Sequence, residues 1–454
     1  GVNVGVEFSA ALRPVDRLTS REDDVGGPPP SVLLIGESTV ATRPGGLNRY
    51  LESLLGALRD RMSATALVVG DGEPQRGLLS GSPADTSLIA RLLGARRAAA
   101  AASVPDVVDV HFALYGLLPV TTTRLRRLPL VAHFHGPWAE ESRVARGEPG
   151  LVTAAKVALE KAVYRRAAAV VVLSRAFGDL VTDRYGVDPA RVVVMPPGVD
   201  LERFTPGDRV AARDRLGLPE RAFVAVAVRR LDPRMGLDVL LDAWARVQAQ
   251  LPDAVLVIAG EGRERDHLDS RRRLLPNPSG VRLVGRVSEE QLVDLYRAAD
   301  CSVVPTRALE GFGLVTLESA ACGTPAVVTD VGGLPDGVVG LDPSLVVPPE
   351  DPDALADRLL RAAAGQLPSR EATRRHAEQF SWEAVARAHV ELYRRVARPP
   401  LRVAYLGHTA ALSGGELALA RLLPALRGVD PLVILGEDGP LVERLQAQGV
   451  TVEV

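Results

Sequence analysis

Residues 301–330 read "CSVVPTRALEGFGLVTLESAACGTPAVVTD" and contain one complete strand, helix and strand. The β-branched runs "CSVVPT" and "PAVVTD" have the composition of buried strands, and the segment that starts near Leu314 is expected to be a helix. The glycine-rich turn "EGFG" joins the first strand to this helix. Two strands with an intervening helix predict a parallel pair, because antiparallel neighbours need only a tight turn.

The same alternation of strand and helix continues on both sides of this unit. One set of strands runs to about residue 350 and also includes "FVAVAVRR", "AVLVIAGEG", "VRLVGRV" and "SLVVPP". An earlier set consists of "SVLLIG", "ALVVG", "DVVDVHF", "LPLVAHFHG", "AVVVLS" and "RVVVMPPGVD". A polar segment with Pro and Gly punctuation, residues 205–220, separates the two sets. We therefore expect an α/β protein with two Rossmann-like, doubly wound parallel-sheet domains that face a cleft.

These patterns predict the domain boundaries. The first domain is expected at residues 31–204 and the second at 205–379, followed by a closing amphipathic helix at 380–397 with Ser381 as its N-cap. Residues 1–30 form an N-terminal extension that ends in the polar, Pro-Gly stretch "GGPPP". No function is assigned to this extension.

The last segment, residues 401–454, repeats the opening of the first domain. It reads as strand, glycine loop, helix, strand, helix and strand, and Gly414 and Gly415 mirror Gly45 and Gly46. Three strands cannot readily complete a domain of that size, so the segment is interpreted as the truncated start of a second copy. The alternative is that these strands complete the first fold.

Composition excludes several classes of protein. A chain of 454 residues with 46% hydrophobic content is long enough for two or three domains with real cores, and its net charge of −2 gives no general reason to expect nucleic-acid binding. The longest apolar runs are too short to span a membrane, and no signal peptide opens the sequence. The two unclustered cysteines, Cys301 and Cys322, provide neither a disulfide framework nor zinc spacing, which suits buried thiols in a reducing cytoplasm.

The turn before the helix at Leu314 has the features of an anion site. The free amides of a helix N-terminus attract phosphate, and Gly311 and Gly313 allow a ligand to approach closely. Glu310 and Glu318 would repel a phosphate, so they are expected to accept hydrogen bonds from sugar hydroxyls. The alternative is an ordinary capped helix with a solvated Glu face.

The loop "RRLDPRMG", residues 229–236, gathers three arginines at the end of the first strand of the second domain. Guanidinium groups match phosphate oxygens, so this loop and the helix amides could hold a diphosphate together. "AGEGRERD" provides a further glycine turn at a strand end. A solvent-exposed arginine loop is the alternative.

Ordered motifs make the chain similar to retaining GT-B glycosyltransferases of family four. The resemblance covers residues 31–397, and it rests on "EGFGLVTLE", "VVLSRAF", "VVVMPPGVDLERF", "VAVRRLDPRMGLDVLLDAW", "VIAGEGRE", "VRLVGRVSEEQLVDLYRAADCSVVPT" and "FSWEAV". It implies a hexosyltransferase-type enzyme with a nucleotide-diphosphate-sugar donor held by the second domain and an acceptor held by the first. It also implies transfer with retention of anomeric configuration and no required metal or other cofactor.

The resemblance carries roles to individual residues. His135 and Glu310 match the catalytic pair beside the donor sugar, and Glu318 matches the ribose ligand. Gly45 and Gly46 match a loop near the donor phosphates and the acceptor. The remaining donor-binding matches are Arg230, Arg234, Gly260, Arg286, Val287, Gly311, Phe312, Gly313, Leu314 and Val315. His111 and His133 match less clearly, and core or acceptor-side roles are equally open.

The sequence departs from the family in the arginine loop. Arg229 stands where the family has glycine, and Met235 stands where it has lysine. Methionine cannot bind phosphate by charge, so Arg234, one residue earlier, is expected to replace the missing ammonium. The departures leave one alternative open, a catalytically impaired protein that binds nucleotide-sugars or glycans. A related phosphate-dependent disaccharide phosphorylase is a second alternative.

The resemblance also bears on mechanism and partners. The pattern offers no second carboxylate for a glycosidase-like displacement, which favours attack on the face that the phosphate leaves. Members of the family often act on lipid-linked or cell-surface glycans, so the acceptor could be a glycan, a lipid-linked sugar or a small molecule, and peripheral contact with the inner face of the membrane is a further expectation. The nucleotide base, the donor sugar, the acceptor and the oligomeric state are not specified by the sequence.

Overall fold

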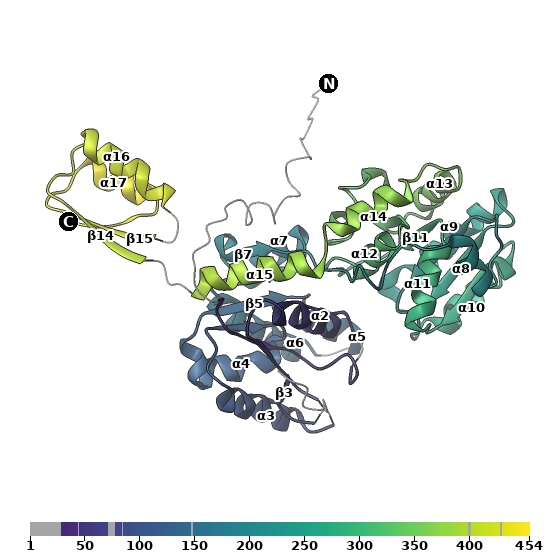
Figure 1. Ribbon diagram of the computed structural model, residues 1–454, viewed down its shortest axis with the longest axis horizontal. Helices are drawn as coiled ribbons and strands as arrows, with labels where there is room; N and C mark the ends of the chain where they lie inside the picture. Colours follow the sequence, from purple (N-terminus) through teal and green to yellow (C-terminus); the bar gives the residue numbers. More distant parts are fainter. Residues whose placement is uncertain are drawn as a thin grey trace. The chain divides into compact units, whose positions relative to one another are not determined.

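The computed structural model describes residues 29–43, 45–70, 78–83, 85–146, 149–397, 401–426 and 429–454 (Figure 1). The expected N-terminal extension, residues 1–30, lies almost entirely outside them. The chain divides into two compact units between Glu391 and Leu392, and each unit is described by itself.

The first unit begins with a seven-stranded sheet in the order β3-β2-β1-β4-β5-β6-β7, in which every neighbouring pair is parallel. Most of its strands are buried along their whole length, which is why they appear in the sequence as continuous apolar runs rather than alternating ones. The strands are β1 (Val32–Ile35), β2 (Ala64–Val68), β3 (Leu78–Ser80), β4 (Val107–Val110), β5 (Leu130–Phe134), β6 (Ala169–Val172) and β7 (Val192–Val194).

Helices connect these strands. Helix α7 shows how the sequence sets their ends: the Ser174 side chain accepts a hydrogen bond from the Phe177 amide at the start, and Gly186 ends the helix in the left-handed conformation. The helices are α2 (Gly46–Arg59), α3 (Leu88–Ala101), α4 (Ala113–Thr122), α5 (Trp138–Arg146), α6 (Gly150–Arg166) and α7 (Arg175–Tyr185).

A second parallel sheet has six strands in the order β10-β9-β8-β11-β12-β13. Its strands are β8 (Val224–Val228), β9 (Val255–Ala259), β10 (Val281–Gly285), β11 (Cys301–Val304), β12 (Ala326–Thr329) and β13 (Val346–Val347). Its helices are α8 (Arg209–Arg215), α9 (Leu237–Gln250), α10 (Arg265–Arg272), α11 (Glu289–Ala298), α12 (Leu314–Ala321), α13 (Pro352–Ala363) and α14 (Arg370–Glu378). Helix α14 packs against α12 (Figure 1).

The segment at residues 205–220 is more than the polar linker expected from its sequence. It contains α8, which Asp208 caps by accepting hydrogen bonds from two amides and which packs against α11. Arg213 of this helix is 1% exposed. A sequence pattern cannot distinguish an arginine that is buried and hydrogen-bonded from one that is exposed to solvent. The burial of Arg213, and with it the packing of α8, was therefore not predicted.

Both sheets reverse their strand order beside their first strand, since β1 lies between β2 and β4, and β8 lies between β9 and β11. In such sheets ligands bind outside the carboxyl ends of the strands at the reversal. The predicted fold class, two parallel-sheet α/β domains, is confirmed. Both cysteines are buried, as expected.

Helix α15 (Trp382–Ala397) follows the second sheet and begins within the predicted closing segment. Ser381 caps it, as expected, by accepting a hydrogen bond from the Ala384 amide at 3.2 Å. The start of the helix is tied to the end of the first domain, because the Val199 amide donates to the Phe380 carbonyl at 2.8 Å.

The second unit contains a separate three-stranded parallel sheet in the order β14-β15-β16 (Figure 1). The elements are β14 (Leu401–Gly407), α16 (Gly414–Leu422), β15 (Val429–Leu435), α17 (Pro440–Ala447) and β16 (Thr451–Glu453). In the described part of the chain these strands pair only with one another, so they do not complete the first fold.

Candidate functional site

The glycine turn predicted as an anion site lies between β11 and α12, at the strand-order reversal of the second sheet. Gly313 is the N-cap of α12 with φ 80°, and among the described residues no side chain caps the helix there. A Cβ on Gly313 would lie 2.5 Å from the Leu334 side chain, so both the left-handed backbone and the space require glycine. The first amides of α12 are thus left for a ligand.

Glu318 lies one turn into α12 and is 5% exposed. Its Oε1 accepts a hydrogen bond from Arg49 Nη1 of α2 at 3.2 Å, and its Oε2 accepts one from the Tyr296 hydroxyl at 3.3 Å. Burial raises the pKa of Glu318, and the Arg49 charge opposes that rise. The carboxylate helps line a cavity of about 190 Å³ together with Leu314 and Trp382.

Glu310 lies on the turn and forms an ion pair with Arg229 of the arginine loop. The preceding residue, Leu309, has a positive φ of 58°, which is unusual for a residue other than glycine. Its carbonyl accepts a hydrogen bond from Arg234 Nη1 at 2.7 Å. Two arginines of the loop therefore hold the turn on which Glu310 stands.

The arginine loop follows β8, and its three arginines differ in their exposure to solvent. Arg230 is exposed, Arg234 is half-buried with its guanidinium against the turn, and the Arg229 side chain is only 7% exposed. Arg229 Nη2 lies 2.7 Å from Thr306 Oγ1 and 3.0 Å from Met235 Sδ. The Arg229 guanidinium thus occupies space beside Met235, the position where the resemblance leads one to expect a lysine.

His135 comes directly after β5, at the edge of the first sheet. Its Nε2 lies 3.1 Å from His111 Nδ1, and its ring centroid is 4.9 Å from that of Tyr50. Burial and the neighbouring histidines hold the pKa of His135 well below its usual range, so the ring is neutral at pH 7. A neutral imidazole can bond to a sugar hydroxyl but brings no full positive charge.

Gly311, which follows Glu310, lies close to His135. The structure therefore brings together the segments that carry the two predicted catalytic residues, Glu310 and His135. A Cβ on Gly311 would lie 3.0 Å from the Phe177 ring and 3.6 Å from the His135 carbonyl oxygen. The Arg175 amide also donates to Asp336 Oδ2 at 3.2 Å, which joins the start of α7 to the second domain.

Comparison with protein families divides the chain at the same place as its sheets. Residues 44–203 match Glycosyltransferase Family 4, and residues 208–380 match Glycosyl transferases group 1. The chain belongs to these glycosyltransferase families.

Named relatives of this glycosyltransferase share more than a third of their aligned residues with it. A D-inositol 3-phosphate glycosyltransferase of Geodermatophilus obscurus is 37% identical over 63% of this chain and 66% of its own length. D-inositol 3-phosphate glycosyltransferase 1 of Catenulispora acidiphila is 35% identical over 71% of this chain and 81% of its own. The chain thus spans about two thirds of the first relative's length.

Among solved structures, the glycosyltransferase is similar to Anabaena Alr3699/HepE in complex with UDP. The two are 19% identical with a TM-score of 0.66, over 80% of this chain and 99% of the other. This likeness supports the GT-B fold. Among the described residues of the glycosyltransferase, no helix combines the length and apolar character needed to cross a membrane.

The other predicted residues lie around the same strand ends. Gly260 follows β9 with a positive φ, and a Cβ there would lie 1.8 Å from the Arg229 carbonyl oxygen. Val287 is half-buried, whereas the Arg286 side chain is 74% exposed and lies 3.8 Å from Glu261. Gly45 is the N-cap of α2 and Gly46 is its first residue. A Cβ added at either glycine would have no atom within 4 Å. Phe312 is a core residue at 1% exposure, and Val315 packs against the core.

Two residues at this site, Arg49 and Tyr296, are not predicted from the sequence. Arg49 and Tyr296 are ordinary helix residues in the sequence, and only the fold brings them to Glu318. Arg229 did carry a signal, because its replacement of glycine coincides with the replacement of lysine by Met235. The sequence reasoning assigned the compensation to Arg234 instead.

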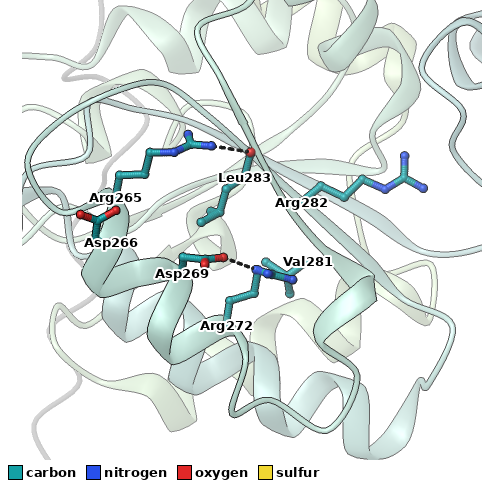
Figure 2. A pocket seen from close by; sticks show the side chains of 7 residues that line it. All are labelled: Arg265, Asp266, Asp269, Arg272, Val281, Arg282 and Leu283. Carbon is teal, nitrogen blue, oxygen red and sulfur yellow. Dashed lines mark hydrogen bonds and ion pairs between the residues drawn. The ribbon is translucent and has the colours of Figure 1, made fainter.

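A larger cavity of about 360 Å³ lies between α10 and β10 (Figure 2). Three of its arginines already have partners: Arg272 bonds to Asp269 at 2.8 Å, Arg265 reaches the Leu283 carbonyl at 3.4 Å, and Arg282 bonds to the Gly217 carbonyl at 2.9 Å. It is lined by Arg265, Asp266, Asp269, Arg272, Val281, Arg282 and Leu283, none of which was predicted as a site residue. We do not place the functional site there.

Proposed function

We propose that this glycosyltransferase moves a hexosyl group from a nucleotide-diphosphate-sugar to an acceptor hydroxyl with retention of anomeric configuration. The observation that carries the proposal is the start of α12, where free helix amides lie between loop-borne Glu310, just before the helix, and buried Glu318, one turn inside it. Amides suit the distal phosphate, and the two carboxylates suit hydroxyl groups on either side of it. UDP in the similar HepE structure supports a nucleotide donor.

Each group at the site has a proposed part in donor binding. Glu318 accepts hydrogen bonds from the ribose hydroxyls, while the amides of Gly313, Leu314 and Val315 hold the distal phosphate. Glu310 orients the donor sugar. Positive charge for the diphosphate comes from the arginine loop, in which exposed Arg230 is free of the ion pair that engages Arg229.

Retention is proposed to result from attack on the face from which the phosphate departs. The departing phosphate accepts the proton of the acceptor hydroxyl, and the helix amides stabilise its developing charge. His135, as a neutral ring, fixes a donor sugar hydroxyl near the reacting carbon. Closure of the two domains positions donor and acceptor, and no added metal ion is required for this step.

We propose a small, hydroxyl-rich phosphorylated acceptor as the first to test. The support comes from the relatives whose names specify D-inositol 3-phosphate. Glycan and lipid-linked acceptors, with peripheral contact at the inner face of a membrane, are the other proposed classes.

A nucleotide-sugar panel tests the function. Thermal stabilisation and slow hydrolysis are measured with UDP-, GDP-, ADP-, CDP- and dTDP-sugars, and one donor class should both stabilise the protein and release its nucleotide diphosphate. Stabilisation without release would indicate the catalytically impaired binder. Sugar release that depends on inorganic phosphate would indicate a disaccharide phosphorylase.

Arginine variants test the proposed diphosphate contacts. Arg230→Ala and Arg234→Ala should each weaken nucleotide-diphosphate binding by roughly tenfold or more, since hydrogen bonds to charged groups are worth about 1.5–3 kcal/mol. Calorimetric titration measures both. Unchanged affinity in Arg234→Ala would contradict the idea that this residue replaces the missing lysine.

We also propose that residues 401–454 repeat the opening elements of the first domain. The support is the shared strand order, because β14, β15 and β16 pair in the same succession and direction as β1, β2 and β3. Helix α16 begins at Gly414 as α2 begins at Gly46.

A further inference from the structure

The carboxylate of Glu318 is held by residues from both domains of the first unit. Arg49 Nη1, on α2 of the first domain, donates to Glu318 Oε1 at 3.2 Å. The Tyr296 hydroxyl, on α11 of the second domain, donates to Glu318 Oε2 at 3.3 Å. The proposed donor site therefore includes a contact from the domain that was expected to hold the acceptor.

These two contacts fix the orientation of the carboxylate. The last torsion of a glutamate side chain is only weakly restricted by itself, so the direction of its oxygens depends on their partners. One oxygen of Glu318 accepts from a guanidinium, and the other accepts from the hydroxyl of Tyr296, a residue that is 0% exposed. Each oxygen of this buried carboxylate thus has its own partner.

The arrangement leaves acceptor capacity on both oxygens. An ionised carboxylate has about four lone-pair sites, two on each oxygen, and Arg49 and Tyr296 use one site each. Two adjacent hydroxyls, such as the 2′ and 3′ hydroxyls of a ribose, can therefore each donate to a different oxygen. Glu318 and Leu314, the first residue of α12, line the same cavity of about 190 Å³, so a ligand there meets both the carboxylate and the start of the helix.

A second arginine near Glu318 is directed elsewhere. Arg203 also lines the cavity, but its Nη1 pairs with Glu289 Oε1 at 3.2 Å and its guanidinium lies 4.9 Å from the centre of the Phe204 ring. Burial raises the pKa of Glu318, and the charges of Arg49 and Arg203 both oppose this rise. Of these two cations, Arg49 is the one that contacts the carboxylate and can set its direction.

We propose that Arg49 is a positioning residue for donor binding, which orients Glu318 so that both carboxylate oxygens accept hydrogen bonds from adjacent hydroxyls of the donor ribose. The inference rests on the proposed function, in which Glu318 is the ribose ligand. Arg49 acts through Glu318, because its guanidinium is bonded to that carboxylate. Loss of Arg49 should therefore weaken recognition of the ribose hydroxyls and leave the contacts to the rest of the donor unchanged.

Nucleotides with and without the 2′ hydroxyl distinguish this role from a merely structural one. The tightest binder among UDP, GDP, ADP and CDP is titrated calorimetrically into the full chain, beside its 2′-deoxy counterpart. Wild type should favour the ribonucleotide by roughly tenfold or more, because the deoxy form lacks a hydrogen bond to a charged group. In Arg49→Met this preference should fall to about threefold or less, through weaker binding of the ribonucleotide. Arg49→Lys, which keeps the charge, should retain most of the preference.

The matched control is Arg59→Met. Arg59 is an exposed arginine at the end of the same helix, and its replacement should leave both affinities unchanged. Because the Arg49 side chain is 44% exposed, Arg49→Met should fold as the control does, and the unfolding temperatures check this. An unchanged preference for the ribonucleotide in Arg49→Met, or an equal loss of affinity for both nucleotides, would overturn the inference.

Glu318→Ala separates failure of this inference from failure of the proposed function. If Glu318→Ala loses the preference for the ribonucleotide and Arg49→Met keeps it, Glu318 remains the ribose ligand and the positioning role of Arg49 is wrong. If the preference survives in Glu318→Ala, or if none of the four nucleotides binds, the proposed donor site is wrong and the inference is overturned with it.

Discussion

Arg229 is the residue whose placement most changes the interpretation of the donor site. Its guanidinium contacts Met235 Sδ and pairs with Glu310, so the cation sits beside the methionine that replaces a lysine. The two differences from the family pattern can then be interpreted together. Arg229 in place of glycine supplies the positive charge that Met235, in place of lysine, has lost. Arg234 provides a second cation in this loop and also holds the turn through its bond to the Leu309 carbonyl.

A double substitution tests this exchange. Arg229→Gly should weaken nucleotide-diphosphate binding roughly tenfold, because a charge-assisted contact is lost and Glu310 is left unpaired. Arg229→Gly with Met235→Lys should recover most of the affinity, as measured by calorimetric titration and treated as a double-mutant cycle. Equal affinity of wild type and Arg229→Gly would show that the charge does not act on the donor.

The sequence predicts site residues that interact with near neighbours in the chain. It does not predict contacts between residues that are far apart in sequence. The glycine turn was predictable because Gly311 and Gly313 adjoin their helix. The partners of Glu318 were not, since Arg49 is 269 positions away and reaches it only through the fold.

Helix α8 depends on one buried arginine. Arg213 donates to the carbonyls of Pro219, Glu220, Ala222 and Ala298 and to Asp300 Oδ2. Arg213→Ala should destabilise the second domain by about 3–5 kcal/mol, because it removes one of the two arginines that pair with Asp300 and leaves several buried carbonyls without their donor. Urea unfolding measures the loss. Arg215→Ala, on the exposed side of α8, should have a much smaller effect, and similar losses would contradict the account.

Helices α6 and α7 are joined by a carboxyl group with a raised pKa. Glu160 is 1% exposed, its Oε2 accepts from the Tyr185 hydroxyl at 3.1 Å, and burial raises its pKa to about 7. The folded state therefore binds more protons than the unfolded state between about pH 4.5 and 7. In that window the contribution of Glu160 to stability falls as pH rises.

Glu160→Gln should remove this pH dependence. We consider the free energy of unfolding of the variant minus that of wild type. This difference should be larger by about 2–3 kcal/mol at pH 8 than at pH 5, because a neutral amide avoids the cost of a buried charge. Urea unfolding at both pH values provides the comparison. A difference between the two proteins that does not change with pH would contradict the raised pKa.

Among the secondary-structure elements, the buried strands were easier to predict from the sequence than the polar helix α8. Runs such as Ala169–Val172 of β6 could only be buried strands, and Ser381 capped α15 as expected. The segment that forms α8 is rich in arginine and aspartate, and this composition predicts a linker rather than a packed helix. Its burial depends on Asp300 and on carbonyls that no local pattern contains.

The two-unit division has a direct functional consequence for the whole molecule. Every residue proposed to bind the donor lies before the boundary at Glu391. A chain that ends at residue 397, where α15 ends, should therefore bind nucleotide diphosphates as tightly as the full chain. Calorimetric titration compares the two, and a loss of affinity on truncation would show that residues 401–454 take part in donor binding.

Calorimetric titration of nucleoside diphosphates into wild type and Glu318→Ala tests the central claim most directly. At least one of UDP, GDP, ADP, CDP and dTDP should bind saturably at one site, and Glu318→Ala should weaken it by roughly tenfold or more. Glu371→Ala, a change at an exposed glutamate of α14, should leave the affinity unchanged. The absence of binding by every nucleotide, or equal affinity in the Glu318 variant, would contradict the proposed donor site.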